Sequence, residues 1–402
     1  MSNNVTRESI VADVLGNTPH RLMILEHATG VGKSYSSLKI MEKVKPKKIL
    51  LMVKEISHKV NWTEEFVKWG LEQWLEVTTM ECYASLKKYT NTTWDMVILD
   101  EVHNLNQNRM TMLSTIKSNI YVALSATIEP RFKQYLCSIL KIGIEDVYHS
   151  KVSLSQAIYS GILPQPNIYL IPLILKNENP TEVLIEKRGY PINRQVIHCS
   201  FEDRLKYLKG GKYRNVEVHI KCTETEKYIQ LTNNVDYWKE EYMRNYSQAA
   251  HNYWMQAAIT RKRFLGNAKT EHVKPILNKL KDSRYICFCA SVKQAKELGA
   301  KTAIHSKNKK SEETLESFQR KDINSIFAVG MLTEGQNLVD IDAGIIIQLD
   351  SKERSYLQKS GRVLRSKEPE QYIFYYKNTQ DEKYLSTIIE DIPKEFYSIL
   401  KL

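Results

Sequence analysis

The chain has 402 residues, enough for two or three domains with buried cores, and its hydrophobic content of 42% indicates a globular protein, not a disordered tail. The formal net charge of +12 favours a polyanionic partner, most simply a nucleic acid, although a solubilising surface would carry the same charge. The six cysteines show no Cys-x-x-Cys spacing, which argues against a zinc site or a disulfide framework. No signal peptide and no apolar run of about 20 residues is found, so we expect a cytoplasmic protein without membrane contact.

The first part of the chain alternates short apolar runs with helical patterns. The apolar runs lie at residues 21–26, 48–53, 96–99 and 121–124, and helices are expected to start near Lys33 and Ser57. Such alternation is typical of a parallel sheet with helical crossovers. Polar motifs follow three of the strands, at the carboxyl edge where open α/β sheets bind ligands.

The segment His27-Ala-Thr-Gly-Val-Gly-Lys-Ser34 joins the first strand to the following helix. Its glycines let backbone N–H groups turn towards a phosphate, and the helix adds its positive N-terminal dipole. Lys33 would reach the β- and γ-phosphates of ATP and the Ser34 hydroxyl would bind Mg²⁺. We therefore assign the ATP contacts to the loop residues Thr29, Gly30, Val31, Gly32, Lys33 and Ser34.

Two acidic residues end the third apolar run. Asp100 is placed to hold Mg²⁺, and Glu101 is placed to polarise the attacking water. His103 lies two residues further on, in line with the expected cleft, and is assigned a relay role. Ser125-Ala-Thr127 ends the fourth run in the same way.

A proline-marked boundary at residues 161–166 separates two domains, which we place at 1–165 and 166–402. The parallel-sheet pattern resumes in the second domain at 285–289, 325–329 and 343–349. Between these parts lies an α+β insert at about 176–270. The fold class is therefore α/β, with two parallel-sheet domains in tandem.

The insert has two notable segments. Residues 187–212 are basic and lie between expected strands at 168–175 and 214–221, so they form either a hairpin that contacts a duplex or a solvated loop. One or two long helices are expected from Thr223 to about Leu265. We expect most of their aromatic residues to pack the helix on the domain, and stacking on nucleic-acid bases is the alternative. These aromatic residues are Tyr228, Tyr237, Trp238, Tyr242, Tyr246, Tyr253 and Trp254.

The order Asp-Glu-x-His at residue 100, Ser-Ala-Thr at 125 and Gln-x-x-Gly-Arg-x-x-Arg at 358 resembles superfamily 2 helicases and translocases of the DExH group. Residues 153–164 are similar to the linker of phage-encoded DNA helicases and restriction-enzyme motor domains. The resemblance spans nearly the whole chain. It implies two RecA-like domains with ATP between them, a nucleic-acid substrate, most simply DNA, and a monomeric motor.

The same resemblance assigns roles to residues outside the phosphate loop. It implies that Arg362 and Arg365 reach the γ-phosphate across the cleft and that Gln358 holds them or the phosphate. Ser125, Thr127, His103 and Glu334 would couple hydrolysis to movement, with Gly335 beside the nucleotide. Contacts to the nucleic-acid backbone are implied for Lys54, Thr79, Ser291 and Thr333.

Two departures from the family pattern bear on function. No glutamine precedes Gln73, so the adenine-reading glutamine of many relatives is missing before the phosphate loop. Little sequence follows the arginine motif, so we expect any strand-separating element to lie in the insert. An RNA helicase, or an ATP-gated clamp or annealing protein with little turnover, remains an alternative to a DNA motor; an intact Glu101 argues against the clamp.

Overall fold

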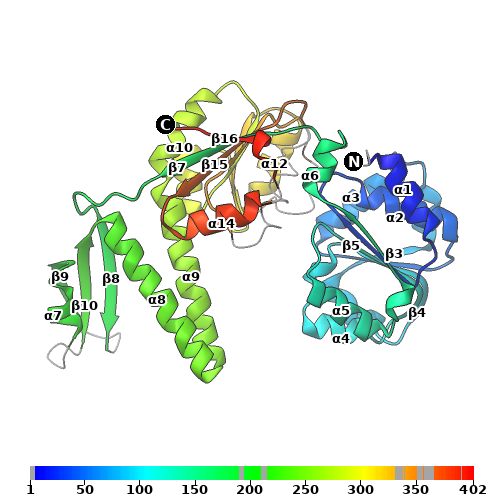
Figure 1. Ribbon diagram of the computed structural model, residues 1–402, viewed down its shortest axis with the longest axis horizontal. Helices are drawn as coiled ribbons and strands as arrows, with labels where there is room; N and C mark the ends of the chain where they lie inside the picture. The colour runs from blue at the N-terminus through cyan, green and yellow to red at the C-terminus, as the bar shows by residue number, and fades with distance from the viewer. Residues whose placement is uncertain are drawn as a thin grey trace.

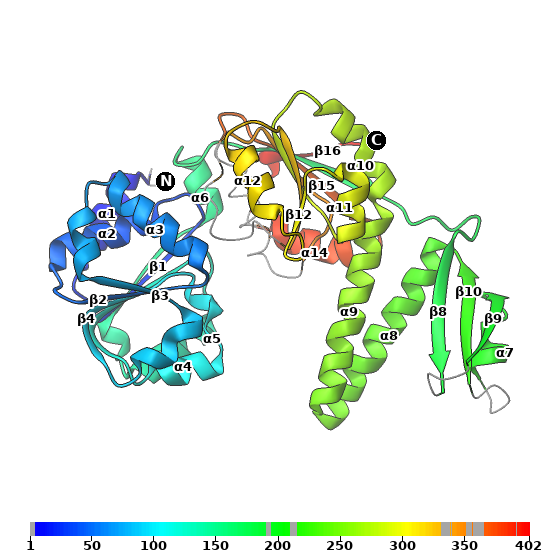
Figure 2. The same ribbon diagram turned by 180° about the vertical axis from the view of Figure 1, so that it is seen from behind.

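The computed structural model describes residues 5–189, 194–209, 215–330, 338, 340–350, 356, 366–390 and 392–402. Each of two lobes has a parallel sheet with helices on its faces, and a long helical hairpin and a small sheet extend from the second lobe (Figure 1, Figure 2). Short 3-10 helices connect several of the larger elements, at Glu72–Val77, Tyr83–Tyr89, Val102–Asn104, Ile144–Asp146 and Lys394–Phe396.

The first lobe is built on a six-stranded parallel sheet with the strand order β3-β2-β4-β5-β1-β6. Its strands are β1 (Leu22–His27), β2 (Ile49–Val53), β3 (Thr78–Cys82), β4 (Thr93–Leu99), β5 (Lys117–Ser125) and β6 (Val147–Val152). Its helices are α1 (Arg7–Gly16), α2 (Lys33–Val44), α3 (Ile56–Lys68), α4 (Gln107–Leu113) and α5 (Pro130–Leu140). Every residue of β1 is buried, and alternate residues enter two different cores: Met23 and Leu25 face one, Leu22 and Ile24 the other. Both faces are therefore covered, which explains the continuous apolar runs in the sequence.

The second lobe has a seven-stranded parallel sheet with the order β12-β13-β11-β14-β15-β7-β16. The strands are β7 (Asn167–Leu173), β11 (Tyr285–Phe288), β12 (Ala303–His305), β13 (Ser325–Val329), β14 (Ala343–Ile346), β15 (Glu370–Tyr376) and β16 (Tyr397–Ile399). The helices are α10 (Thr270–Lys279), α11 (Val292–Gly299), α12 (Ser311–Gln319) and α14 (Gln380–Ile389). The expected fold class, two parallel-sheet α/β domains, is confirmed.

The connection between the lobes contacts both of them. Helix α6 (Leu154–Tyr159) begins with a capping box in which the Ser153 hydroxyl accepts from the Gln156 N–H. At the end of this helix, Ser160 Oγ accepts a hydrogen bond of 3.2 Å from the N–H of Val5 in the first lobe. The adjacent Tyr159 ring lies 5.3 Å from the Phe396 ring of the second lobe. The linker is thus a packed element and not a free tether.

The insert between β7 and α10 has two parts. A three-stranded sheet has the order β8-β10-β9, with strands β8 (Glu182–Arg188), β9 (Gln195–Ser200) and β10 (Val216–Cys222), beside helix α7 (Arg204–Leu208). Helices α8 (Glu224–Asn245) and α9 (Gln248–Ala268) form an antiparallel hairpin that runs away from the second lobe and back (Figure 1, Figure 2). The basic segment 187–212 is therefore not one loop, because β9 and α7 lie within it and β9 pairs in parallel with β10.

The aromatic residues of the hairpin pack mainly on one another. Rings stack across the two helices between Trp238 and Tyr253, with centroids 4.6 Å apart, and between Tyr242 and Trp254, at 5.8 Å. The expectation that most of them pack the helix on the domain was wrong. Tyr228 does reach the domain, because its hydroxyl accepts from the Gln380 N–H at 2.8 Å. Interhelical packing is what holds so long a hairpin together away from the lobe.

A fully buried lysine fixes the base of the hairpin. Lys269 follows α9 directly and is 0% exposed. Its ammonium group donates to the carbonyl oxygens of Ile347 at 2.7 Å and Phe374 at 2.8 Å, and pairs with Asp381 at 2.6 Å. All three donors of the ammonium group are thus engaged. Burial lowers the pKa of Lys269, while the Asp381 carboxylate opposes that shift.

Replacing Lys269 with methionine is expected to destabilise the second lobe by about 3–5 kcal/mol, because the buried Asp381 carboxylate loses its partner. The measurement is the free energy of unfolding from urea titration. The double variant Lys269→Met/Asp381→Leu is the control, because it removes both charges, and it should recover much of the loss. Equal instability of single and double variants would show that the ion pair itself matters little.

Candidate ATP-hydrolysis site

The phosphate loop connects the buried strand β1 to helix α2. Gly30 and Gly32 have φ angles of +92° and +113°, in the region that L side chains rarely adopt. A Cβ on Gly30 would also lie 3.0 Å from Leu163 Cδ2 of the linker, so a side chain at this position would force Leu163 to shift. Helix α2 starts at Lys33 with no side-chain cap and no acidic residue in its first turn. Its first N–H groups and its dipole therefore suit an anion.

His27 and Lys33, at the two ends of the phosphate loop, contact each other. Lys33 Nζ donates to the His27 carbonyl at 2.9 Å, so the ammonium group lies over the loop. The His27 ring is buried against Ser150, with Nε2 at 2.9 Å from the hydroxyl. Burial and then the charge of Lys33 lower the pKa of His27 to about 3. The histidine in place of the usual first glycine is therefore a neutral core residue, which adds no charge beside the phosphates.

Asp100 is held at the end of β4 by an aromatic donor. Its Oδ2 accepts a hydrogen bond of 2.9 Å from the indole N–H of Trp62 on α3, and His58 Nδ1 lies 3.7 Å away. The Asp100 carbonyl accepts from the Tyr83 hydroxyl at 3.0 Å. One carboxylate oxygen is thus oriented by the indole, which leaves the other available for a ligand such as Mg²⁺.

Glu101 occupies a left-handed backbone conformation, with φ 49° and ψ 54°. This conformation is uncommon for a residue with a side chain, and it turns the chain sharply from the strand into a short 3-10 helix. Glu101 Oε2 lies 3.4 Å from His103 Nδ1. The two side chains assigned to water activation and relay are therefore neighbours.

His103 links the acidic motif to the end of the adjacent strand β5. Its Nδ1 lies 2.9 Å from Ser125 Oγ, whose own hydrogen goes to the Thr127 carbonyl at 2.7 Å. The serine must therefore accept from His103, so Nδ1 carries the proton. On the other side of the ring, Nε2 accepts from the Asn104 amide at 3.2 Å. Both ring nitrogens therefore have hydrogen-bond partners, and His103, Ser125 and Thr127 form one connected network. The fourth residue predicted to couple hydrolysis to movement, Glu334, lies outside the described residues.

The strand order brings these motifs to one edge of the sheet. Strands β4, β5 and β1 are consecutive neighbours and parallel, so the residues after them emerge at the same carboxyl edge. Two strand spacings, about 10 Å, separate the β1 and β4 chains, with Ser125 between them. The donors of the loop, the Lys33 ammonium, the Ser34 hydroxyl and the Asp100 carboxylate form a set that fits a triphosphate with a divalent cation.

Three of the residues predicted to contact nucleic acid are described, and they lie in different parts of the structure. Lys54 follows β2 at the carboxyl edge of the sheet. Thr79 is the second residue of β3 and pairs with Leu50, so it lies near the opposite end of the strands and is not brought together with Lys54. Ser291 caps helix α11, and its hydroxyl donates to Asn267 of the hairpin at 2.6 Å. Its observed contacts join the hairpin to the second lobe.

Six of the predicted site residues lie outside the described residues. They are Thr333, Glu334, Gly335, Gln358, Arg362 and Arg365. Their assignments stay predictions from the sequence resemblance.

Sequence reasoning missed a buried acid beside the phosphate loop. Glu26 is the residue before His27, and its carboxylate accepts from His149 at 2.9 Å and pairs with Lys151 at 3.3 Å. Burial would raise the pKa of Glu26, but these two partners outweigh it and leave the pKa below its ordinary value. The only available signal was an acidic residue ending an apolar strand. The partners come from β6, whose place beside β1 is a tertiary fact.

Two family models match separate parts of the chain. Residues 4–90 match the type III restriction enzyme res subunit, and residues 268–367 match the helicase conserved C-terminal domain. Together these matches support a helicase of superfamily 2. The first match contains the phosphate loop, and the two parallel sheets agree with tandem RecA-like helicase domains. The small sheet, the Asp100–Glu101 motif and the hairpin up to Asn267 lie between the two matched ranges.

Among solved structures, the chain is similar to the helicase domain of Hef from Pyrococcus furiosus. The sequence identity is 12%, the TM-score is 0.48, and the match covers 95% of this chain and 97% of the other. No curated protein matches the chain. Within the described ranges, no helix is long and apolar enough to cross a membrane, and no cluster of three metal-ligating side chains is found.

Proposed function

We propose that this chain is a DNA-dependent ATPase that moves along or unwinds DNA, acting as a monomer in the cytoplasm of its host cell. The observation that carries the proposal is the shared edge of β1, β5 and β4, where the phosphate loop meets the network of His103 and Ser125. The helicase-type family matches support an ATP-dependent nucleic-acid motor. The net charge of +12 suits a polyanionic track.

In this proposal each residue at the edge has one task. Lys33 and the loop N–H groups hold the phosphates, and Ser34 and Asp100 hold Mg²⁺. When bound, the ion neutralises phosphate charge as the γ-phosphoryl leaves. Glu101 orients the attacking water, and His103 passes the state of the site to Ser125 and Thr127. Loss of the γ-phosphate would thereby alter contacts at the ends of the neighbouring strands β4 and β5.

ATP hydrolysis rates without nucleic acid and with single-stranded DNA, duplex DNA, forked DNA or single-stranded RNA test this function. We expect stimulation by DNA and little by RNA, and the best DNA would identify the track. Stimulation by RNA alone would make the chain an RNA helicase. A rate near zero on every nucleic acid, together with tight binding, would leave the ATP-gated clamp.

A further inference from the structure

The linker between the lobes packs directly on the phosphate loop. Leu163 of the linker is 4% exposed. Among the described residues, and apart from the chain neighbours of Gly30, only its Cδ2 lies within 4 Å of the position that a Cβ on Gly30 would take. The Leu163 methyl group therefore covers the face of Gly30 from which a side chain is missing. Gly30 is one of the loop residues assigned to the phosphates of ATP, so this contact lies at the candidate site itself.

A second contact joins the same loop to the strand that leads into the linker. The Ala28 N–H donates to the Val152 carbonyl at 2.9 Å, and Val152 is the last residue of β6, directly before α6 and its cap. Ala28 and Val31 are buried, and they belong to the same hydrophobic core as Leu163. The loop is thus attached to the interlobe connection on both sides of Gly30, by a hydrogen bond before it and by apolar packing after it.

Hydrogen bonds hold Leu163 in place without any contribution from the loop. Its N–H donates to the Ala157 carbonyl of α6 at 3.0 Å. The guanidinium group of Arg7, on α1, donates to the adjacent Ile162 carbonyl at 3.2 Å. Leu163 is therefore a fixed side chain on which the loop rests, and not one that the loop positions.

A support of this kind matters because a glycine-rich loop can adopt many backbone conformations. If the loop had to be ordered when it closed on the phosphates, each ordered residue would lower the affinity by about 5–30-fold. A loop that is already held in its binding conformation avoids this loss. Its own donors stay available for the ligand, because helix α2 begins without a side-chain cap.

We propose that Leu163 is a positioning residue of the ATP site, which holds Gly30 and the adjacent backbone in the conformation that receives the phosphates. The proposal rests on the proposed function, because it assumes that this loop binds ATP. In this role Leu163 acts through Gly30 and not on the nucleotide. The segment that joins the two lobes is then part of the nucleotide site, so ATP and the packed linker favour the same conformation of the loop.

The test is equilibrium binding of ATP with Mg²⁺, without nucleic acid, together with steady-state hydrolysis. Leu163→Ala should raise the Kd for ATP about tenfold, because Gly30 loses its support. The kcat should change by less than about twofold, since a loop that must be ordered weakens ground-state and transition-state binding equally. Leu163→Met keeps the side-chain volume and should bind ATP nearly as the wild type does. Leu163→Val should give a smaller rise, and it serves if Leu163→Ala does not fold.

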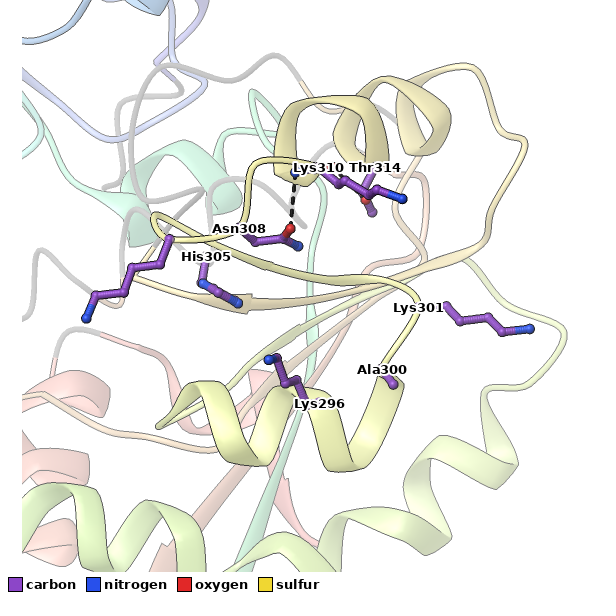
Figure 3. A pocket seen from close by; sticks show the side chains of 8 residues that line it. Lys296, Ala300, Lys301, His305, Asn308, Lys310 and Thr314 are labelled. Atoms are coloured by element: carbon purple, nitrogen blue, oxygen red, sulfur yellow. Dashed lines mark hydrogen bonds between the residues drawn. The ribbon is translucent and has the colours of Figure 1, made fainter.

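Two control variants separate positioning from a loss of stability. Leu154→Ala shortens a buried leucine of the same core on α6, but Leu154 does not lie within 4 Å of the Cβ position on Gly30. Asn308→Ala removes the hydrogen bond that its side chain accepts from the Lys310 N–H in the second lobe (Figure 3). Both should lower the thermal unfolding midpoint and leave the Kd for ATP unchanged. An equal rise of the Kd in Leu154→Ala and Leu163→Ala would overturn the proposal.

Further outcomes separate this proposal from the proposed function. If the wild type binds ATP but Leu163→Ala keeps the wild-type Kd, or loses only kcat, Leu163 is not a positioning residue, whichever nucleic acid stimulates hydrolysis. If the Kd rises as expected but RNA alone stimulates hydrolysis, the positioning role stands and the DNA assignment is wrong. If the wild type binds no ATP, both proposals fall.

Discussion

Replacement of Lys33 by alanine is expected to abolish ATP hydrolysis. The ammonium group lies over the phosphate loop, where it donates to the His27 carbonyl, and it is the cation of the first lobe that we assign to the β- and γ-phosphates. Without it, the negative charge that spreads over the γ-oxygens during hydrolysis loses one of its positive partners. Turnover should fall to background under saturating DNA, as measured by phosphate release.

A matched variant on the same helix separates this effect from a general loss of charge. Lys39 pairs with Glu42 at 2.6 Å on the surface of α2, and Lys39→Ala should keep nearly full turnover. Both proteins should have the same thermal unfolding midpoint, because Lys33 contributes no buried ion pair among the described residues. Normal ATP hydrolysis in Lys33→Ala would show that this loop does not bind the phosphates of ATP.

The second large effect is expected for Arg362→Ala, which should keep ATP binding and lose turnover. The sequence resemblance places this guanidinium at the γ-phosphate, and such a residue contributes about 10³–10⁵ in rate, roughly 4–7 kcal/mol. Because the contribution arises in the transition state, kcat should fall while the Kd for ATP changes little. Rapid-quench hydrolysis and equilibrium nucleotide binding measure the two quantities.

Arg362→Lys makes this prediction sharper. A lysine keeps the charge but cannot pair with two oxygens, so only a small part of the lost rate should return. An unchanged kcat in Arg362→Ala would refute the role in hydrolysis. Loss of ATP binding in proportion to kcat would instead make the residue a ground-state contact.

Local sequence patterns were enough to predict the central strands of the two sheets and the glycine turn of the phosphate loop, but not β3, β6, β12, β15 or β16. Strands β1 and β2 are buried on both faces, so their apolar runs were continuous and easy to recognise, whereas the partly exposed β3 and β6 have no such run. Gly30 and Gly32 occupy backbone conformations that only glycine adopts readily, so their positions also followed from sequence. The sequence placed the His103 and Ser125 motifs at the carboxyl edge of the sheet, but it did not predict the contact between the two side chains.

The contacts that the sequence did not predict depend on tertiary neighbours. Trp62 orients Asp100 from a helix 38 residues away in sequence, and no local pattern links the two. The hairpin aromatics were expected on the domain because a single amphipathic pattern does not reveal which surface it meets.

Because Lys269 fixes the base of the hairpin to the second lobe, the hairpin has a mechanical role in any domain movement. Helix α8 has 22 residues, which corresponds to about 33 Å at 1.5 Å per residue. Lys269, at the base of the partner helix α9, is hydrogen-bonded to the carbonyl oxygens of Ile347, which follows β14, and Phe374 in β15. The hairpin should therefore turn with that sheet as a stiff arm. A domain rotation of about 10° would carry its far end through roughly 6 Å, nearly two nucleotide spacings of about 3.4 Å. A small rotation of the second lobe would then move the tip of the hairpin by a distance comparable to the spacing of nucleotides in a nucleic acid.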